Sequence, residues 1–184
     1  FLSVEGQNKC GRIHSADLGF PPSLMDSIRT KAFFLEKSDL QRFICKKTLT
    51  SNKGDFGRPL LIAGSINYPG ALILCAGAAL KANAGVITAL TTPSLRDLAV
   101  TLYPEVTFNV IDDIDLISIK LRQFTSSQYT SVAFGPGVGN SLDFKSIFQT
   151  LFEKYPKLPF IIDADALKPF SDNQKHYKKL IVNK

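Results

Sequence analysis

The chain has 184 residues, of which 45% are hydrophobic and 21% are charged. This composition is that of an ordinary globular protein that can bury a hydrophobic core, so disorder is not the default expectation. The formal net charge is +6, but residues 29–53 carry seven basic and two acidic side chains, whereas residues 54–184 carry thirteen and eleven. Because most of the excess positive charge lies in this one segment, we expect a solvated basic linker and no nucleic-acid partner.

The cysteines and histidines argue against two kinds of cross-link that stabilise small domains. Cys10, Cys45 and Cys75 lie far apart, form no CxxC pair, and accompany two isolated histidines. This pattern argues against a zinc site and a disulfide framework, and favours a reducing, cytoplasmic compartment. No signal-peptide pattern is visible, and the apolar runs are too short to span a membrane, so we expect no membrane partner.

Residues 1–22 and 23–52 do not read as a domain of their own. In the first segment, Arg12 to Leu18 is a candidate strand that Gly19 and a Pro-Pro pair bring to an end. The second segment is amphipathic and basic, and the sequence KSDL at residues 37–40 begins a candidate helix with Leu40, Phe43 and Ile44 on one face. We interpret residues 1–22 as the tail of a preceding domain and residues 23–52 as a linker with one docking helix.

The stretch from Lys53 to Gly85 predicts a strand, a glycine turn and a helix. Residues 59–63 are continuously apolar, as in a strand buried on both faces of a parallel sheet, and Gly64 allows a sharp turn after it. Pro69 suits the first turn of a helix. Because residues 70–80 contain no charge, we expect this helix to be buried nearly all round.

After this unit, candidate strands alternate with candidate helices of about ten residues. This alternation is typical of βαβ units and predicts an α/β fold with a mostly parallel sheet and helices on both faces. Asp112, Asp113 and Asp115 gather where a helix begins, which the helix dipole explains without a metal. The candidate strands are 86–90, 107–111, 131–134, 159–162 and 179–182, and the candidate helices are 93–102, 115–124, 142–155 and a short one near Ala166.

Loops at the carboxyl ends of parallel strands bind ligands, and two unusual loops lie there besides Gly64-Ser65. The first is GPGVG at residues 135–139, whose backbone N–H groups would suit a phosphate before a helix capped by Asn140 or Ser141. It is neither a Walker loop nor a dinucleotide fingerprint, and a simple tight turn is the alternative.

The second loop holds two carboxylates, Asp163 and Asp165, after an apolar strand. Side chains two apart on a strand share a face, so both could bond a ligand hydroxyl or hold Mg²⁺ through water. In the alternative, Asp165 caps the next helix and Asp163 accepts a bond from a loop N–H. The two interpretations are left open here.

Together these motifs resemble a known family. KGDFGRPLLIAGS, the PGA at residues 69–71, GPGVG and IIDADAL, in this order, closely resemble the ADP- or ATP-dependent NAD(P)H-hydrate dehydratases, which have a ribokinase-like fold. The sequence GRIHSADLGFP resembles the last strand of the epimerase domain that precedes the dehydratase in the bifunctional form. The resemblance implies that residues 53–184 are the N-terminal part of a dehydratase domain, with a ribokinase-like fold that is incomplete at the C-terminus.

The resemblance also implies a reaction and its participants. A nucleotide, ADP or ATP with Mg²⁺, would activate the ring hydroxyl of NADH-hydrate or NADPH-hydrate, and elimination would restore the dihydropyridine ring. Implied partners are the missing C-terminal part or the epimerase domain, and a homo-oligomer. A small-molecule kinase of the same superfamily, or an inactive fragment, is the alternative.

Substrate contacts are expected at the carboxyl edge of the predicted sheet, whereas the catalytic residue is unknown. The family's His-Pro-x-Glu, Lys-Gly and Gly-x-Gly-Asp motifs, the last with the expected base, are not in these 184 residues. Leu72 replaces a small residue and could narrow the site, and Asn83 replaces a glycine but tolerates a left-handed backbone. The expected substrate-binding residues are Gly64, Ser65, Gly70, Ala71, Leu72, Gly135, Gly137, Gly139, Asp163 and Asp165.

Overall fold

The computed structural model describes residues 3–14, 16–28, 35–41, 48–125 and 127–172. The chain divides into two compact units, Phe1–Phe43 and Ile44–Lys184, and each is described by itself. The division falls within the predicted linker, residues 23–52. The assignment of residues 1–22 to a preceding domain stays a prediction.

Unit 1 contains three short helices in its described residues: α1 (Val4–Lys9), α2 (Pro22–Ser27) and α3 (Lys37–Leu40). The predicted helix start at Lys37 is confirmed, and the amide N–H of Glu36 donates to Asp39 Oδ2 at 3.0 Å in a capping box. Phe43 and Ile44, which were predicted on the apolar face of this helix, lie outside the described residues. The strand predicted from Arg12 to Leu18 is wrong for its described residues, because no neighbouring strand pairs with them there.

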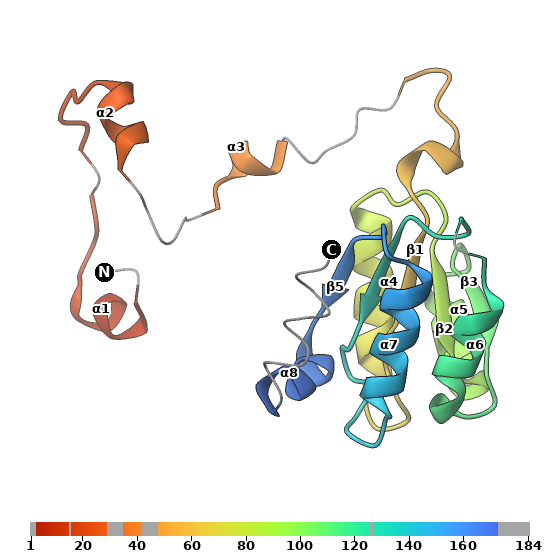
Figure 1. Cartoon of the computed structure of the whole chain (residues 1–184). Coiled ribbons are helices and arrows are strands. Elements are labelled where there is room, and N and C mark those ends of the chain that lie inside the picture. The colour runs from red at the N-terminus through yellow and green to blue at the C-terminus, as the bar shows by residue number, and fades with distance from the viewer. Residues whose placement is uncertain (1–2, 15, 29–34, 42–47, 126, 173–184) are drawn as a thin grey trace. The chain divides into compact units, whose positions relative to one another are not determined.

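Unit 2 is built on one sheet of five parallel strands in the order β3-β2-β1-β4-β5 (Figure 1). Every predicted strand from Pro59 to Ile162 is present, with bounds shifted by two residues at most, and the candidate strand 179–182 lies outside the described residues. The strands are β1 (Pro59–Ile62), β2 (Thr88–Thr91), β3 (Thr107–Val110), β4 (Ser131–Phe134) and β5 (Phe160–Ile162).

The predicted helices between the strands are also present, two of them preceded by 3-10 turns, and they lie on both sides of the sheet (Figure 1). An additional 3-10 turn, η2 (Lys53–Phe56), precedes β1. The helices and turns are α4 (Pro69–Lys81), α5 (Pro93–Leu102), η3 (Ile114–Leu116), α6 (Ile117–Gln123), α7 (Phe144–Lys154), η4 (Ala164–Leu167) and α8 (Lys168–Asp172).

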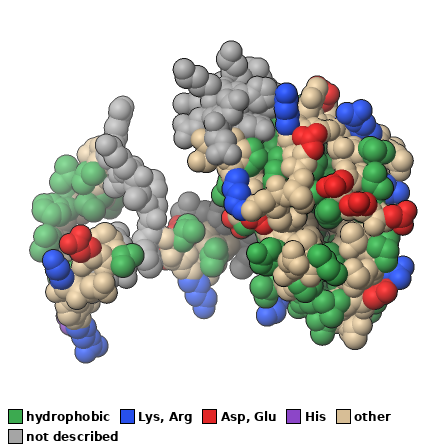
Figure 2. Space-filling model, turned by 90° about the horizontal axis from the view of Figure 1, so that it is seen from below, with side chains coloured by type: hydrophobic (Ala, Val, Ile, Leu, Met, Phe, Trp, Pro, Cys, Tyr) green, Lys and Arg blue, Asp and Glu red, His purple; other side chains and the backbone are tan. Residues whose placement is uncertain are grey.

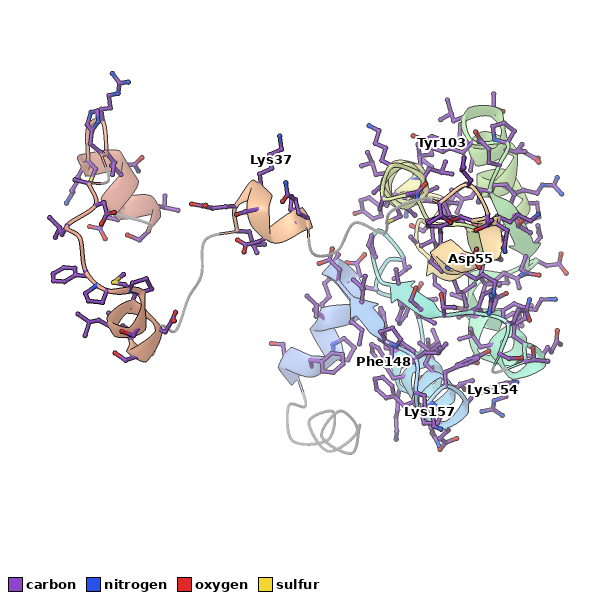
Figure 3. The ribbon with its side chains drawn as sticks, turned by 90° about the horizontal axis from the view of Figure 1, so that it is seen from above. Lys37, Asp55, Tyr103, Phe148, Lys154 and Lys157 are labelled. Atoms are coloured by element: carbon purple, nitrogen blue, oxygen red, sulfur yellow. The ribbon has the colours of Figure 1, made fainter. Side chains whose placement is uncertain are left out.

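Two hydrophobic cores fill the two faces of the sheet because side chains alternate along β1. Leu60 and Ile62 join the core under α6 and α7, whereas Leu61 joins the core under α4 and α5. Tyr103 and Phe148 lie on opposite sides of the sheet (Figure 3). The right-handed crossovers of parallel strands place helices on both faces in this way.

Helix α4 is buried along one stripe and not all round, so that prediction is wrong. Leu72, Ala76 and Gly77 are buried, but the side chain of Leu74 is 75% exposed. An outer-layer helix buries only the stripe that faces the sheet, and no described element covers the other side of α4. The lack of charge in its sequence therefore reflects something other than burial within the described part of the chain.

Candidate functional site

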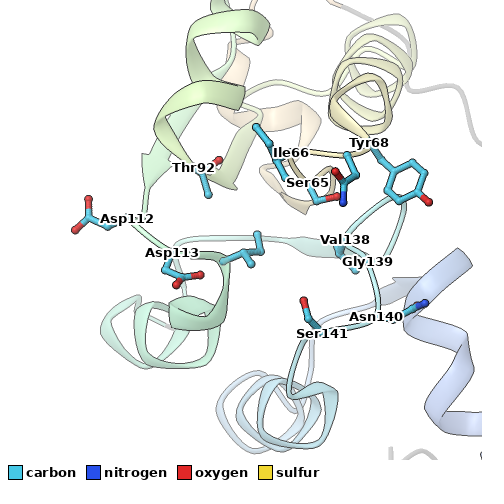
Figure 4. A pocket seen from close by; sticks show the side chains of 12 residues that line it. Ser65, Ile66, Tyr68, Thr92, Asp112, Asp113, Val138, Gly139, Asn140 and Ser141 are labelled. Atoms are coloured by element: carbon cyan, nitrogen blue, oxygen red, sulfur yellow. The ribbon is translucent and has the colours of Figure 1, made fainter.

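The carboxyl ends of β1 to β4 surround an open pocket with a volume of about 430 Å³ (Figure 4). Its walls are the loops that follow these strands, as expected for a parallel α/β sheet. The twelve lining residues are Ser65, Ile66, Asn67, Tyr68, Thr92, Asp112, Asp113, Ile114, Val138, Gly139, Asn140 and Ser141.

Gly64 turns the chain from β1 toward α4 in a left-handed conformation, with φ of +79°. Its amide N–H donates to Pro136 O at 2.8 Å, which ties this turn to the GPGVG loop. A Cβ at Gly64 would lie 3.0 Å from the Cβ of Leu72, so a larger residue would press on α4. The turn places Ser65 at the pocket, where its buried Oγ has no hydrogen-bond partner in the described part of the chain.

The GPGVG loop uses most of its N–H groups inside the protein. Gly135 N–H donates to Ile62 O at 3.1 Å and Val138 N–H to Gly135 O at 3.3 Å. Gly139 N–H donates to Asp165 Oδ2 at 3.0 Å. Since Pro136 has no N–H, the loop retains little capacity to bind a phosphate, and the packed tight turn describes it better.

The predicted helix cap after this loop is wrong. Helix α7 begins at Phe144, and the side chain of Asp143 caps it by accepting a bond from Ser146 N at 3.1 Å. Asn140 and Ser141 instead line the pocket. Aspartate is among the preferred N-cap residues, and Asp143 directly precedes the helix. The residues between the glycine loop and Asp143 separate the loop from the helix N-terminus.

Close packing explains the glycines of the loop. A Cβ at Gly137 would lie 2.6 Å from the Cβ of Ala71 and 2.9 Å from the Cβ of Tyr68, and one at Gly135 would lie 2.7 Å from the Cβ of Ala166. Both glycines also have positive φ angles. The loop therefore joins the start of α4 to the turn that follows β5.

The two carboxylates after β5 do not share a face. The strand ends at Ile162, and Ala164 adopts φ of +49°, which breaks the strand alternation between Asp163 and Asp165. Asp165 holds Gly139 N–H, as above, while Asp163 is exposed and makes no side-chain capping bond at η4. Asp165 therefore accepts the bond from a loop N–H that was expected for Asp163. Asp165 does not cap the following helix.

Asp165 also receives a bond from Lys168 Nζ on its Oδ1, at 2.8 Å. This bond is the main reason why the pKa of Asp165 is lowered; burial opposes the shift and the bond from Gly139 N–H supports it. Lys168 Nζ also donates to Asn140 Oδ1. These contacts fasten the end of the GPGVG loop to the start of α8.

The structure brings only part of the expected substrate-binding set to the pocket. Ser65 and Gly139 line it. Leu72 is 1% exposed and packs in the core between α4 and the sheet, so it does not narrow this pocket. Gly70 is exposed and lines no wall of it. Five further residues of the set do not line the pocket, but their contacts hold the two loops that form its wall: Gly64, Ala71, Gly135, Gly137 and Asp165.

Most polar residues of the pocket were not predicted as site residues. Thr92 follows β2, and Asp112 and Asp113 follow β3. The interpretation of the acidic cluster as a helix start is supported, since Asp113 Oδ1 accepts a bond from Asp115 N at 3.1 Å at the start of η3. Asp112 and Asp113 also lie at the edge of the pocket, although the carboxylate of Asp112 points away from it (Figure 4). Polar side chains directly after two neighbouring strands were the signal available for this.

The pocket contains two carboxylates and no lysine or arginine among its lining residues. No cluster of three metal-binding side chains occurs in the part of the chain that the structure describes. The lining of this pocket thus offers no cationic side chain to the phosphates of ADP or ATP and no set of three protein ligands for Mg²⁺. Among the same residues, no helix has the length and apolar character needed to cross a membrane.

Asn83, which stands where the resembled family has a glycine, has φ of +66°. This left-handed conformation confirms that an asparagine is tolerated at this position.

Comparisons with known proteins connect this site to one family. The family model of the NAD(P)H-hydrate dehydratases matches residues 59–182. The chain is 35% identical over 131 residues to the ADP-dependent (S)-NAD(P)H-hydrate dehydratase of Staphylococcus aureus, which covers 70% of this chain and 45% of that protein. It is 27% identical over 181 residues to the bifunctional NAD(P)H-hydrate repair enzyme of Vibrio cholerae, with 97% of this chain and 35% of that protein covered.

Solved structures agree with this relationship. A ribokinase-like superfamily protein of Enterococcus faecalis matches with a TM-score of 0.62 and 26% identity, over 79% of this chain and 52% of that chain. The ADP/ATP-dependent NAD(P)H-hydrate dehydratase of Bacillus subtilis, co-crystallised with ATP and Mg²⁺, matches with a TM-score of 0.60 and 25% identity, over 76% and 48%. The chain thus spans about half, or less, of the relatives that it matches.

Proposed function

Because the chain belongs to the NAD(P)H-hydrate dehydratase family, we propose that it forms the substrate-binding wall of a lyase that dehydrates hydrated NADH or NADPH in a nucleotide-dependent reaction. The observation that carries the proposal is the 430 Å³ pocket at the carboxyl edge of the sheet. Its two rims, Gly64-Ser65 and the GPGVG loop, are joined by the bond from Gly64 N–H to Pro136 O. Two of the loops that carry family motifs therefore contribute residues, Ser65 and Gly139, to the pocket wall.

The pocket offers what a hydrated nicotinamide ring requires. Ile66, Tyr68 and Val138 supply apolar surface for a flat ring. Ser65, with its unpaired buried Oγ, and Asn67 offer hydrogen bonds to a carboxamide or a ring hydroxyl. In this proposal these residues bind and orient the ring, whereas the base belongs to the Gly-x-Gly-Asp motif that the 184 residues do not contain.

The proposal extends to the cofactors and surroundings of the enzyme. ADP or ATP with Mg²⁺ would be bound by residues outside the described pocket, because this pocket has no cation and few free N–H groups to receive phosphates. The protein would act in the cytoplasm, together with the remaining half of the dehydratase domain or an epimerase domain, and as a homo-oligomer. The family match favours the dehydratase over a small-molecule kinase.

A direct assay tests the proposed reaction. We expect the protein expressed from its complete reading frame to restore the 340 nm absorbance of hydrated NADPH only when ADP or ATP is present with Mg²⁺. A Gly137→Ala variant should lose this activity, because the added Cβ would lie 2.6 Å from that of Ala71 at the pocket rim. Absorbance recovery without any nucleotide, or phosphorylation of a small hydroxymethyl compound in its place, would refute the proposal.

A further inference from the structure

Residues 139–141 form one wall of the pocket without backbone-to-backbone hydrogen bonds of their own. The buried side chains of Val138 and Leu142 anchor this segment on either side, both in the core under α6 and α7. Between these anchors, Asn140 and Ser141 are exposed and line the pocket. Among the described residues, no other backbone group donates to or accepts from the backbone of residues 139–141. The position of this wall therefore depends on side chains.

Two side chains that follow β5 hold this segment from behind. Asp165 Oδ2 accepts the bond from Gly139 N–H at 3.0 Å, and Lys168 Nζ donates to Asn140 Oδ1. Lys168 Nζ also donates to Asp165 Oδ1 at 2.8 Å, across three residues that belong to η4 and α8. Because the two held residues are neighbours in the chain, the three bonds form a closed network in which each bond orients the others. We call Asp165 and Lys168 the loop clamp.

The side-chain directions show that the loop clamp contacts the wall on its outer side. In Figure 4 the side chain of Asn140 points away from the pocket, toward the segment that follows β5, whereas the side chain of Ser141 points to the opening. Asp165 and Lys168 do not line the pocket themselves. Residues that fix a binding surface from behind, and do not contact the ligand, determine how precisely that surface is placed.

We infer that Asp165 and Lys168 are positioning residues of the pocket: they hold residues 139–141 in place, and the affinity for the ligand depends on them, whereas the chemical step does not. The inference rests on the proposed function only in naming that ligand, a hydrated nicotinamide dinucleotide. It connects the pocket to α8, an element that lines no part of it. A wall that moves loses contacts to the ground state and to the transition state alike, which raises KM at constant kcat.

Lys168→Met tests the inference with little risk to folding, because the side chain of Lys168 is 53% exposed and methionine retains most of its apolar stem. The variant is prepared from the complete reading frame and assayed at 340 nm. We expect KM for hydrated NADPH to rise about three- to fivefold, as for the loss of a partly exposed ion pair, with kcat and the KM for ATP changed by less than about twofold. A variant that is only less stable would lower kcat and leave KM unchanged.

Hydrogen exchange tests the loop clamp without reference to any reaction. The amide of Gly139 is protected by its bond to Asp165, and Lys168 orients that carboxylate. We expect Lys168→Met to speed exchange of this amide by about fivefold, because the bond then opens more often. Mass spectrometry of the peptide that spans residues 135–142 measures the change.

Lys154→Met is the matched control for both measurements. Lys154 on α7 also donates from its Nζ to another element, to Arg122 O at the end of α6, and it does not line the pocket. The substitution therefore removes the same charge and the same kind of bond from a place that has no contact with the pocket wall. It should change neither the KM nor the exchange of residues 135–142.

Four results would overturn the inference. These are an unchanged exchange rate in Lys168→Met, faster exchange with an unchanged KM, a lower kcat with an unchanged KM, or equal effects in Lys154→Met. The two measurements also separate this inference from the proposed function. A wild-type protein without dehydratase activity would refute the proposed reaction, and the exchange of the Gly139 amide would still decide whether Lys168 holds the pocket wall.

Discussion

At the scale of single residues, Asp165 shows how one side chain joins two loops that lie 26 residues apart in the sequence. It accepts bonds from Gly139 N–H and from Lys168 Nζ, whereas Asp163, two residues earlier, is exposed and makes no capping bond. The two aspartates look equivalent in the motif IIDADAL. Only Asp165 holds the rim of the pocket.

We predict that Asp165→Ala lowers the free energy of unfolding by about 1–3 kcal/mol, because it leaves the partly buried Gly139 N–H and the Lys168 ammonium without their acceptor. Asp163→Ala is the control and should change stability by less than about 0.5 kcal/mol. Urea denaturation of the two variants measures the difference. Equal losses in both variants would contradict the role assigned to Asp165.

The effect of Asp165 should also depend on pH. Its pKa is lowered from the ordinary value of 3.8 in the folded protein, first by the bond from Lys168. A carboxyl with a lowered folded pKa contributes stability that is fully present above its unfolded pKa and is lost as the pH falls through its folded pKa. The difference between the wild-type chain and Asp165→Ala should therefore be constant near neutral pH and shrink below about pH 4.

At the scale of elements, α4 contains two glycines with opposite surroundings. A Cβ at Gly77 would lie 2.9 Å from Cζ of Tyr103 and closer still to its hydroxyl, because α4 and the end of α5 approach each other there (Figure 3). A Cβ at Gly70 would meet nothing within 4 Å. Helix packing thus requires a glycine at position 77 but not at position 70.

We predict that Gly77→Ala destabilises unit 2 by about 1–3 kcal/mol through overpacking. Adding Tyr103→Phe, which removes the hydroxyl that a new Cβ would meet first, should restore part of the loss. Gly70→Ala should be neutral or stabilising by up to about 1 kcal/mol, because alanine favours a helix. Thermal unfolding tests the three variants, and a cost at Gly70 similar to that at Gly77 would disprove this account.

At the scale of the whole molecule, β5 forms one of the two edges of the sheet in the described part of the chain, and β3 forms the other. Ile161 on this strand is 66% exposed. An apolar groove of about 590 Å³ lies on the opposite face of β5, to which Phe160 and Ile162 belong, and Figure 2 shows several hydrophobic side chains at the surface of unit 2. Exposed edge strands with apolar side chains pair with other chains. The groove is lined by Phe152, Leu158, Pro159, Phe160, Ile162, Leu167 and Phe170.

We predict that the 184-residue chain, prepared by itself, self-associates through this edge. Ile161→Lys should shift it toward a monomer in size-exclusion chromatography with light scattering, because a lysine on an edge strand opposes strand pairing. Ile119→Lys is the matched control, since Ile119 on α6 is similarly exposed at 56% and lies on a helix. A monodisperse wild-type monomer that unfolds cooperatively would disprove the prediction.

The sequence by itself determined the order and type of the elements of unit 2. Apolar runs such as residues 59–62, followed by a glycine turn, are typical of strands in a buried parallel sheet, and Gly64 and Gly135 mark turns with a positive φ angle. These signals depend only on residues that are neighbours in the sequence, so they can be recognised without knowledge of the fold. The motif set also identified the family correctly, since a match to residues 59–182 confirms it.

Only the tertiary structure decided what each motif does. Whether the GPGVG loop receives a phosphate depends on where its N–H groups point, and they point to Ile62 O and to Asp165, which are distant in sequence. Leu72 lies in the core because the helix turns that side toward the sheet. Asp112 and Asp113 reach the pocket because β3 ends at the same edge as β1. Hydrogen-bond partners and burial are properties of neighbours in space, and the spacing of motifs along a chain does not specify them.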